Sequence, residues 1–316
     1  MRGLQVEGKA LTWAEQPSAE LLEGQIRIRV KAAGLNRADL LQKAGMYPPP
    51  PGVTDVLGLE CAGEVCETKG ESRWNVGDRV CALLAGGGMA EEVVVDGRHA
   101  LPVPDGLDWA QAAAIPEVFS TAWLNIFELG AAQPGEKILI HAGASGVGTA
   151  AIQLCKAMGN PCWVTLGSEE KLRACRELGA SGGALRHDGI ASLKESGPFN
   201  VALDPVGANY AKDHLDLLAG DGRWVLIGLL GGREATLDLA KILAKRIKLI
   251  GSTLRSRDAD FKAELLSRME QRLWPLFAKG ELKPLMARTF PFEDAESAFA
   301  ELASDKVIGK IILVNQ

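Results

Sequence analysis

The stretch Ile138-Leu139-Ile140-His141-Ala142-Gly143-Ala144-Ser145-Gly146-Val147-Gly148 reads as a buried strand that runs into a glycine-rich turn and opens a helix. The spacing of its three glycines is a variant of the dinucleotide-binding fingerprint. Glycine lets backbone amides approach a pyrophosphate closely, and the start of a helix adds positive dipole character. The loop from Gly143 to Gly148 is therefore predicted to bind a dinucleotide. A tight turn without a ligand is the alternative.

The sequence around this loop alternates between strand and helix patterns. Short apolar runs are separated by stretches with helical periodicity, as in consecutive βαβ units. Six such strands predict a doubly wound parallel sheet, the Rossmann class of α/β fold, and this context favours the ligand-binding interpretation of the loop. The predicted strands are 137–142, 162–166, 183–185, 200–204, 223–228 and 248–253, and the predicted helices are 147–158, 169–178, 210–217 and 237–245.

The first third of the chain follows a different pattern. Residues 25–31 alternate polar and apolar side chains, as a half-buried strand does, and more short apolar runs follow between turn residues. Many short strands with irregular loops predict a barrel or partial barrel. A helix at 261–277 and a last strand at 310–314 are expected to return to it. The predicted domains are 1–115 with 259–316, and 116–258.

Composition excludes several classes of protein. The chain has 316 residues and a formal charge of −5, which argues against electrostatic binding to nucleic acid or an anionic membrane. Its six cysteines and four histidines form no Cys-x-x-Cys and no His-Glu-x-x-His, so no metal site is predicted. Met1 to Trp13 lacks the apolar core of a signal peptide, and a cytoplasmic location is expected.

The end of the second strand of the α/β region predicts which dinucleotide binds. NAD binders carry an acidic residue there, about 20 residues after the glycines, for the ribose hydroxyls. This strand ends instead in Gly167-Ser168, with Lys171 one helical turn further on. Glu169 and Glu170 start the next helix, where acids complement the dipole. No acid at the strand end would repel a 2′-phosphate, so NADPH is the predicted cofactor.

Motifs along almost the whole chain resemble one family, the zinc-independent, zeta-crystallin-like quinone oxidoreductases of the medium-chain dehydrogenase/reductase superfamily. The resemblance implies a GroES-like catalytic domain, a Rossmann domain, a cleft between them and a homodimer. Two C-terminal segments look like the subgroup that contains the tumour-suppressor-inducible quinone reductase. The matching segments are 34–39, 45–48, 58–63, 75–80 and the glycine loop, and for the subgroup 254–258 and 308–311.

The positions of the zinc ligands differ from those of the zinc-dependent relatives. Those relatives hold the catalytic metal partly through the His of a Gly-His-Glu segment, and here the segment reads Gly58-Leu59-Glu60. The early loop 33–36 also lacks their metal-binding Cys, and no lobe of four closely spaced Cys occurs. Zinc-independent chemistry is predicted.

Direct hydride transfer from the nicotinamide to a quinone is the predicted reaction, because the reduced product is a stabilised phenolate. Asn36 and Tyr47 are the predicted catalytic residues on the substrate side. Tyr47 can donate a proton or hydrogen bond to a developing oxyanion, or it can simply anchor the Pro-rich loop after it.

Other cofactor contacts are implied by the resemblance. Thr121 is expected near the nicotinamide, Gly228 and Leu229 under its ring, and Lys310 near the closing cleft. Arg186 reaches the adenosine phosphate or is a solvated loop cation. For a further set the sequence leaves the role open: Asp204 is a crevice residue or a turn cap, His141 is read as a core residue for lack of a partner, and Arg255 and Arg257 bind cofactor, form a dimer contact or lie on the surface.

Two other functions remain open from the sequence. The same scaffold fits an enoyl or enone reductase, with Tyr47 as the proton donor. A non-enzymatic NADPH-binding protein, crystallin-like or RNA-binding, has only the basic cluster Lys241, Lys245, Arg246 and Lys248 in its favour. Met89 stands where relatives commonly have an aromatic residue, which leaves the substrate range open. The physiological acceptor and the choice between one- and two-electron reduction are also open.

Overall fold

The computed structural model describes residues 1–315, and its contacts divide the chain into two compact units. Unit 1 contains Met1–Ser120 and the segment from Leu254 onward, and unit 2 contains Thr121–Thr253. The units therefore change at 120/121 and 253/254, close to the boundaries expected from the sequence. None of the described helices is both long enough and apolar enough to cross a membrane.

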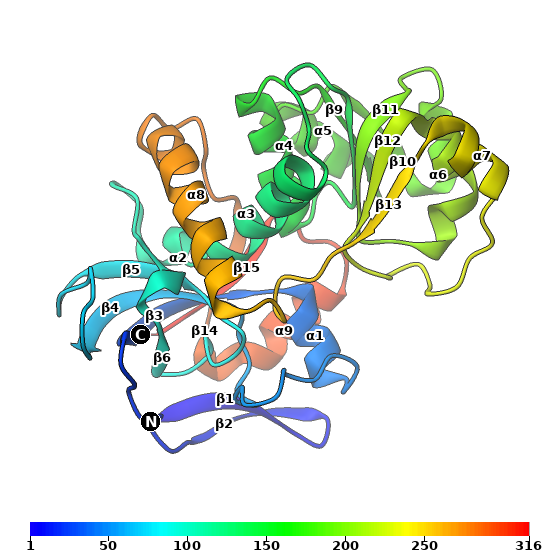
Figure 1. The fold of residues 1–316 in the computed structure, drawn as a ribbon. Helices are drawn as coiled ribbons and strands as arrows, with labels where there is room; N and C mark the ends of the chain where they lie inside the picture. Colours follow the sequence, from blue (N-terminus) through cyan, green and yellow to red (C-terminus); the bar gives the residue numbers. More distant parts are fainter. Residues whose placement is uncertain (316) are drawn as a thin grey trace. The chain divides into compact units, whose positions relative to one another are not determined.

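Unit 2 is built on a six-stranded sheet in the order β10-β9-β8-β11-β12-β13, with every neighbouring pair parallel (Figure 1). The predicted doubly wound sheet is confirmed. Helices α4 and α5 contact β8, β9 and β10, while α7 contacts β12. The elements are β8 (Ile138–His141), α4 (Gly146–Ala157), β9 (Cys162–Leu166), α5 (Glu169–Leu178), β10 (Gly182–Leu185), β11 (Phe199–Asp204), α6 (Ala211–Leu217), β12 (Leu218–Leu226), α7 (Leu239–Lys245) and β13 (Lys248–Gly251).

The central strands of this sheet are mostly apolar because both of their faces are covered, with the polar residues His141 and Asp204 at their ends. All four residues of β8 are buried, as are five of the six in β11. Strand β12 ends at Leu226, two residues before its predicted end. There the chain bends back, since the Ile227 amide bonds Asp204 O at 2.8 Å and the Leu230 amide bonds Pro205 O at 3.0 Å.

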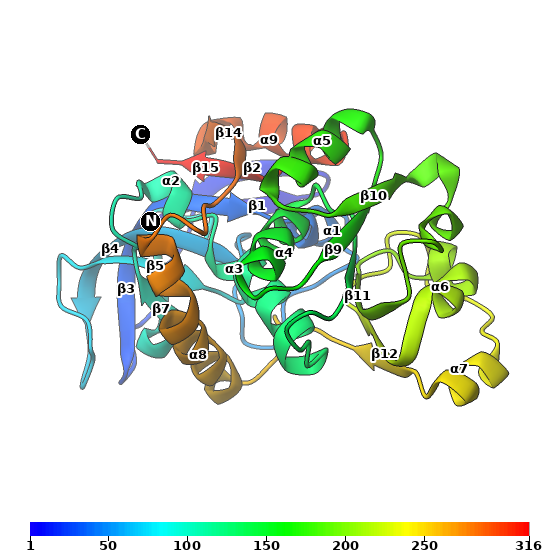
Figure 2. The ribbon, with the colours of Figure 1, turned by 90° about the horizontal axis from the view of Figure 1, so that it is seen from above.

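Unit 1 contains a mostly antiparallel sheet in the order β14-β15-β3-β4-β5-β7, with β6 also paired to β3 and a separate hairpin β1-β2. Figure 2 shows the C-terminal strand β15, in red, beside β14. The strands are β1 (Arg2–Glu7), β2 (Ala10–Glu15), β3 (Gln25–Leu35), β4 (Glu60–Thr68), β5 (Arg79–Leu83), β6 (Glu92–Asp96), β7 (Ala100–Pro102), β14 (Met286–Pro291) and β15 (Lys310–Val314).

The predicted return of the chain end is confirmed, because β15 pairs antiparallel with the end of β3. This second partner also explains why β3 runs four residues beyond its predicted end: residues 32–35 are buried and lose the period-2 pattern. The helices of this part of the chain are α1 (Arg37–Lys43), α2 (Trp109–Ala112), α3 (Pro116–Trp123, which continues past the unit boundary), α8 (Ala259–Ala278) and α9 (Ala295–Ala303).

Candidate functional site

The glycine turn of unit 2 joins β8 to α4 and leaves backbone amides available. Ser145 caps the helix, with its Oγ accepting a hydrogen bond from the Gly148 amide at 3.1 Å. The amides of Gly146 and Val147 lie in the first helical turn and have no acceptor within the helix. A Cβ on Gly148 would lie 2.5 Å from two carbonyl oxygens of the turn, so only glycine lets the turn close. The turn fits the phosphates of a dinucleotide.

The end of β9 brings together four residues predicted from the sequence. A Cβ on Gly167 would lie 2.5 Å from Nη2 of Arg186, so this guanidinium lies directly over the glycine. The Ser168 Oγ caps α5 by accepting from the Lys171 amide at 3.3 Å, and the Lys171 side chain is buried. Glu169 is exposed at the helix start. Two cationic side chains therefore flank a strand end that carries no carboxylate.

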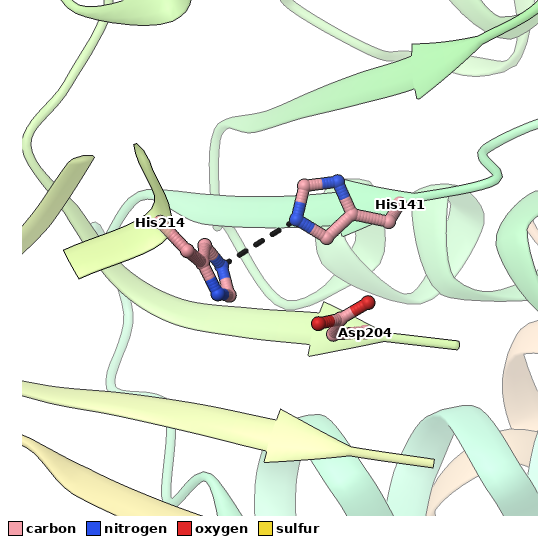
Figure 3. Close-up of side chains that lie close together, drawn as sticks. All are labelled: His141, Asp204 and His214. Carbon is pink, nitrogen blue, oxygen red and sulfur yellow. Dashed lines mark hydrogen bonds between the residues drawn. The ribbon is translucent and has the colours of Figure 1, made fainter. Parts of the chain in front are cut away.

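A second cluster in unit 2 contains His141, Asp204 and His214, at the ends of β8 and β11 and on α6 (Figure 3). All three are buried, and the two Nε2 atoms of the histidines are 3.4 Å apart. His141 Nδ1 is 2.9 Å from Thr165 Oγ1. Burial lowers the pKa of His141 to about 4, against the opposing charge of Asp204, so the ring is neutral at pH 7. The sequence did not reveal the His214 partner because α6 lies far along the chain from β8.

The carboxylate of this cluster is already fully engaged. Asp204 Oδ1 accepts from the amides of Val206 at 2.6 Å and Gly207 at 3.0 Å, and Oδ2 accepts from Trp224 Nε1 at 2.8 Å. This bonding fits the turn-cap interpretation of Asp204. Within residues 1–315, His141, Asp204 and His214 form the only group of at least three side chains whose possible metal-binding atoms all lie within 4.8 Å. We assign no metal to it, because three donors already hold the carboxylate.

Unit 1 brings two other predicted residues, Asn36 and Lys310, into one buried cluster with Glu60. The Lys310 ammonium donates to Leu35 O at 2.8 Å and Asn36 Oδ1 at 2.7 Å, and pairs with Glu60 Oε1 at 2.5 Å. Asn36 Nδ2 donates to Glu60 Oε1 at 3.0 Å. A Cβ on Gly34 would overlap the Glu60 carboxylate. All three donor hydrogens of the ammonium are therefore used inside unit 1, and the Asn36 amide is fixed in orientation.

Asp39 supports this cluster and was not among the predicted site residues. It lies in the first turn of α1, where its Oδ2 accepts from the Asn36 amide at 2.7 Å and its Oδ1 from the Gly58 amide at 3.2 Å. Burial raises its pKa to about 6, although these bonds and Lys310 act to lower it. The spacing Asn36-x-x-Asp39, a capping box, was the available sequence signal.

Tyr47 is half-buried and lies against Arg255. The guanidinium carbon is 5.1 Å from the ring centroid, and Nη1 donates to Tyr47 O at 3.3 Å. Arg255 is 5% exposed, so it is an interior residue of unit 1 and not a surface one. Met89 is completely buried in the hydrophobic core of this unit, together with Leu4 and Leu57.

Three other predicted cofactor residues, Thr121, Gly228 and Leu229, lie outside the strands of the unit 2 sheet. Thr121 opens the unit, and its carbonyl accepts from Asn125 Nδ2 at 2.7 Å. Gly228 packs close to Pro205, where a Cβ would lie 2.9 Å from the proline oxygen, and Leu229 is 51% exposed.

Two of the four cations in the basic cluster on α7 and β13 are paired with carboxylates. Lys241 pairs with Asp216, Arg246 pairs with Asp221, and Lys245 Nζ donates to carbonyl oxygens. The two ion pairs offset half of the positive charge that an RNA-binding surface would need.

Two family models match the chain, one in each part of it. The alcohol dehydrogenase GroES-like domain matches residues 22–105, and the model called zinc-binding dehydrogenase matches residues 146–271. The human synaptic vesicle membrane protein VAT-1 homolog is 30% identical over 310 residues, covering 92% of this chain and 79% of the relative. Polyketide synthase GfsB of Streptomyces halstedii is 35% identical over 313 residues, but the chain spans only 5% of its length.

Solved structures of two kinds share the whole fold. The quinone oxidoreductase of Thermus thermophilus, solved alone and with NADPH, is 31% identical, covers 99% of this chain and 100% of its own, and has a TM-score of 0.85. The CurK enoyl reductase is 26% identical, with coverage of 100% and 99% and a TM-score of 0.85.

Proposed function

Because the chain belongs to the medium-chain dehydrogenase/reductase family, we propose that it is an NADPH-dependent oxidoreductase that reduces quinones without zinc or flavin. The observation that carries the choice of cofactor is the end of β9, where Arg186 lies over Gly167 and the residues directly after the strand, Gly167 and Ser168, carry no carboxylate. The Thermus relative, solved with NADPH, supports the same choice.

The residues present fit this cofactor. The amides of the Gly143–Gly148 turn bind the pyrophosphate, and Ser168, Lys171 and Arg186 bind the 2′-phosphate. Thr121, Gly228 and Leu229 are proposed on the nicotinamide side. Bound there, the cofactor supplies a hydride.

On the substrate side, this chain contributes positioning and a proton donor. The Tyr47 hydroxyl donates to the oxygen that gains negative charge as the acceptor is reduced. Both amide hydrogens of Asn36 are directed at Gly34 O and Glu60, so Asn36 shapes the substrate side with a fixed side chain. Lys310 acts through Asn36 and Glu60, which hold its ammonium. A quinone suits this arrangement because its reduced form needs no strong acid.

The cofactor choice is tested by comparing the Michaelis constants for NADPH and NADH in the wild type and in Arg186→Met. We expect the variant to raise the constant for NADPH about tenfold, as expected for loss of one charge-assisted phosphate contact, and to leave that for NADH nearly unchanged. Arg173→Met is the matched control, since Arg173 is an exposed cation of α5. Equal use of both cofactors by the wild type would overturn the NADPH assignment.

An enoyl or enone reductase is the second candidate, favoured by the similarity to CurK and to a polyketide synthase. Both reactions need a hydride and a proton donor, so the site geometry fits either one. Turnover of a simple quinone and of an enoyl thioester, each with NADPH, separates them. Faster turnover of the thioester would replace quinone by enone in the proposal.

A homodimer in the cytoplasm is the proposed state of the protein. Strand β13 is the last strand of its sheet, and Leu239 and Leu243 on α7 are 73% and 80% exposed. An unpaired edge with exposed leucines favours association. All six cysteines are free thiols, which agrees with a reducing compartment. Light scattering on the wild type and on Leu243→Lys tests the dimer, and a monomeric wild type would contradict it.

A further inference from the structure

Arg255 is a buried cation without a counter-ion. It is 5% exposed, and its guanidinium donates to three neutral oxygens, Ala85 O at 2.7 Å, Gln42 Oε1 at 2.8 Å and Tyr47 O at 3.3 Å. Within residues 1–315 it forms no ion pair with a carboxylate. Lys310, equally buried in the same unit, is paired with Glu60. The positive charge at Arg255 is therefore left uncompensated.

The surroundings of Arg255 do not remove this charge. Lys262 Nζ donates to Arg255 O at 2.8 Å and adds a second buried cation, itself without an ion pair in the described chain. The charges of Asp39 and Glu117 also attract the guanidinium. A buried charge that is not paired is expensive, so its presence points to a role other than stability.

The group that the guanidinium contacts is the Tyr47 ring. The guanidinium carbon of Arg255 is 5.1 Å from the centroid of this ring. The Nη1 of Arg255 also donates a hydrogen bond to Tyr47 O, which fixes the backbone at the same residue. The Tyr47 hydroxyl has no hydrogen-bond partner within residues 1–315, so it is available to a ligand. The nearby positive charge favours negative charge at the Tyr47 hydroxyl, either on its own oxygen or on a ligand oxygen bonded to it.

We propose that Arg255 is the positioning residue of Tyr47: it holds the ring and supplies the counter-charge for an oxyanion formed at the Tyr47 hydroxyl. This inference rests on the proposed function and narrows its substrate class to acceptors whose reduction leaves negative charge on oxygen, as in quinones and α,β-unsaturated carbonyls. The acceptor gains the two electrons of the hydride, and NADPH is oxidised. The Tyr47 O–H bond breaks, its proton passes to the acceptor, and a proton from solvent restores the phenol.

The small number of tyrosines makes a direct test possible. The chain contains only Tyr47 and Tyr210, so tyrosine labelled with ¹³C at Cζ gives two NMR signals, which Tyr210→Phe assigns. We expect Arg255→Met to raise the titration midpoint of Tyr47 by about one pH unit, because a neighbouring opposite charge favours the tyrosinate. Burial and Glu117 act in the opposite direction and remain unchanged. Arg255→Lys keeps the positive charge, so its Tyr47 midpoint should lie close to that of the wild type.

Arg79→Met is the matched control for the NMR experiment. Arg79 also lies over an aromatic ring, that of Trp109 at 4.4 Å, and donates to a backbone carbonyl, that of Leu107. It should leave the Tyr47 midpoint unchanged. An unchanged midpoint in a folded Arg255→Met protein, or an equal shift in Arg79→Met, would overturn the proposal.

A kinetic cycle tests the coupling during turnover. We expect Arg255→Met to lower kcat for a quinone at least tenfold in the wild-type background but less than twofold in Tyr47→Phe, because Arg255 acts through the Tyr47 hydroxyl. Equal losses in both backgrounds would contradict the proposal. If the wild type oxidises NADPH with neither quinones nor enones, the proposed function fails, while the NMR experiment still decides whether Arg255 and Tyr47 are coupled.

Discussion

Two buried polar clusters, one in each unit, balance their charges in different ways. In unit 1, Lys310 and Glu60 form an ion pair that is 4% and 0% exposed. In unit 2, the Asp204 carboxylate is surrounded by neutral donors and lies beside two neutral histidines, one of which is His141. The comparison teaches that a buried carboxylate can be stabilised by one cation or by several neutral hydrogen bonds. The two solutions differ in what happens when one partner is removed or the pH is changed.

Removing the Lys310 cation, the ion-pair partner of Glu60, should have the largest effect on the free energy of unfolding. Lys310→Met leaves Glu60 buried without its partner, and we expect a loss of about 3–5 kcal/mol in the free energy of unfolding, measured by urea denaturation. The double variant with Glu60→Gln should recover part of the loss, because no unpaired charge remains. Lys43→Met is the matched control, since Lys43 forms a more exposed pair with Glu296 that is worth about 1 kcal/mol or less. Equal losses at Lys310 and Lys43 would contradict the buried-pair interpretation.

The pH should affect the two clusters in opposite directions. The pKa of His141 falls from 6.5 to about 4 on folding, so its contribution to stability is present above pH 6.5 and is lost as the pH falls towards 4. The pKa of Asp39 rises from 3.8 to about 6, so its contribution is present below pH 3.8 and is lost as the pH rises through 6. Each change amounts to about 3 kcal/mol.

Unfolding free energies between pH 7 and 4 test this contrast in Asp39→Asn and His141→Gln. The difference between wild type and Asp39→Asn should grow in favour of the wild type as the pH falls from 6 to 4. The difference between wild type and His141→Gln should shrink between pH 6.5 and 4. If the difference in unfolding free energy between wild type and variant changed with pH in the same direction for both variants, the two clusters would not differ in this way.

The neutral donors of unit 2 should give the smallest effect, because each of them carries only part of the stabilisation. Trp224→Phe removes the indole donor to the Asp204 carboxylate and should cost about 1.5–3 kcal/mol in unfolding free energy. Trp274→Phe makes the same chemical change at a bond to Pro102 O, a neutral carbonyl, and should cost about 1 kcal/mol. A greater loss at Trp274 would mean that the bond to Asp204 is not charge-assisted.

How well the elements follow from the sequence differs between the two units. In unit 2, β9 and α5 coincide with their predicted ranges, because each strand, turn and helix is specified by neighbouring residues. In unit 1, the hairpin of β1 and β2 and the short helix α1 were not predicted. Their burial patterns depend on partners elsewhere in the chain, as the C-terminal end of β3 also shows.

For the candidate site, the sequence found single residues but not their partners. Asn36 and Lys310 were named separately, and the structure adds Glu60 between them. His141 was read as a core residue without a partner, and His214 supplies one. These pairs are separated by 24 to 274 positions, and no local pattern indicates such contacts.

The sequence by itself determined the α/β unit, its glycine turn and a strand end without a carboxylate, because these features depend on residues close together in the chain. It also determined that Leu59 stands where zinc-dependent relatives have histidine. Only the tertiary structure decided which charges are balanced. Arg255 and Tyr47 lie 208 positions apart, and their contact forms only when the last segment of the chain packs into unit 1. Local propensity sets the elements, but packing of distant segments sets the electrostatics of the site.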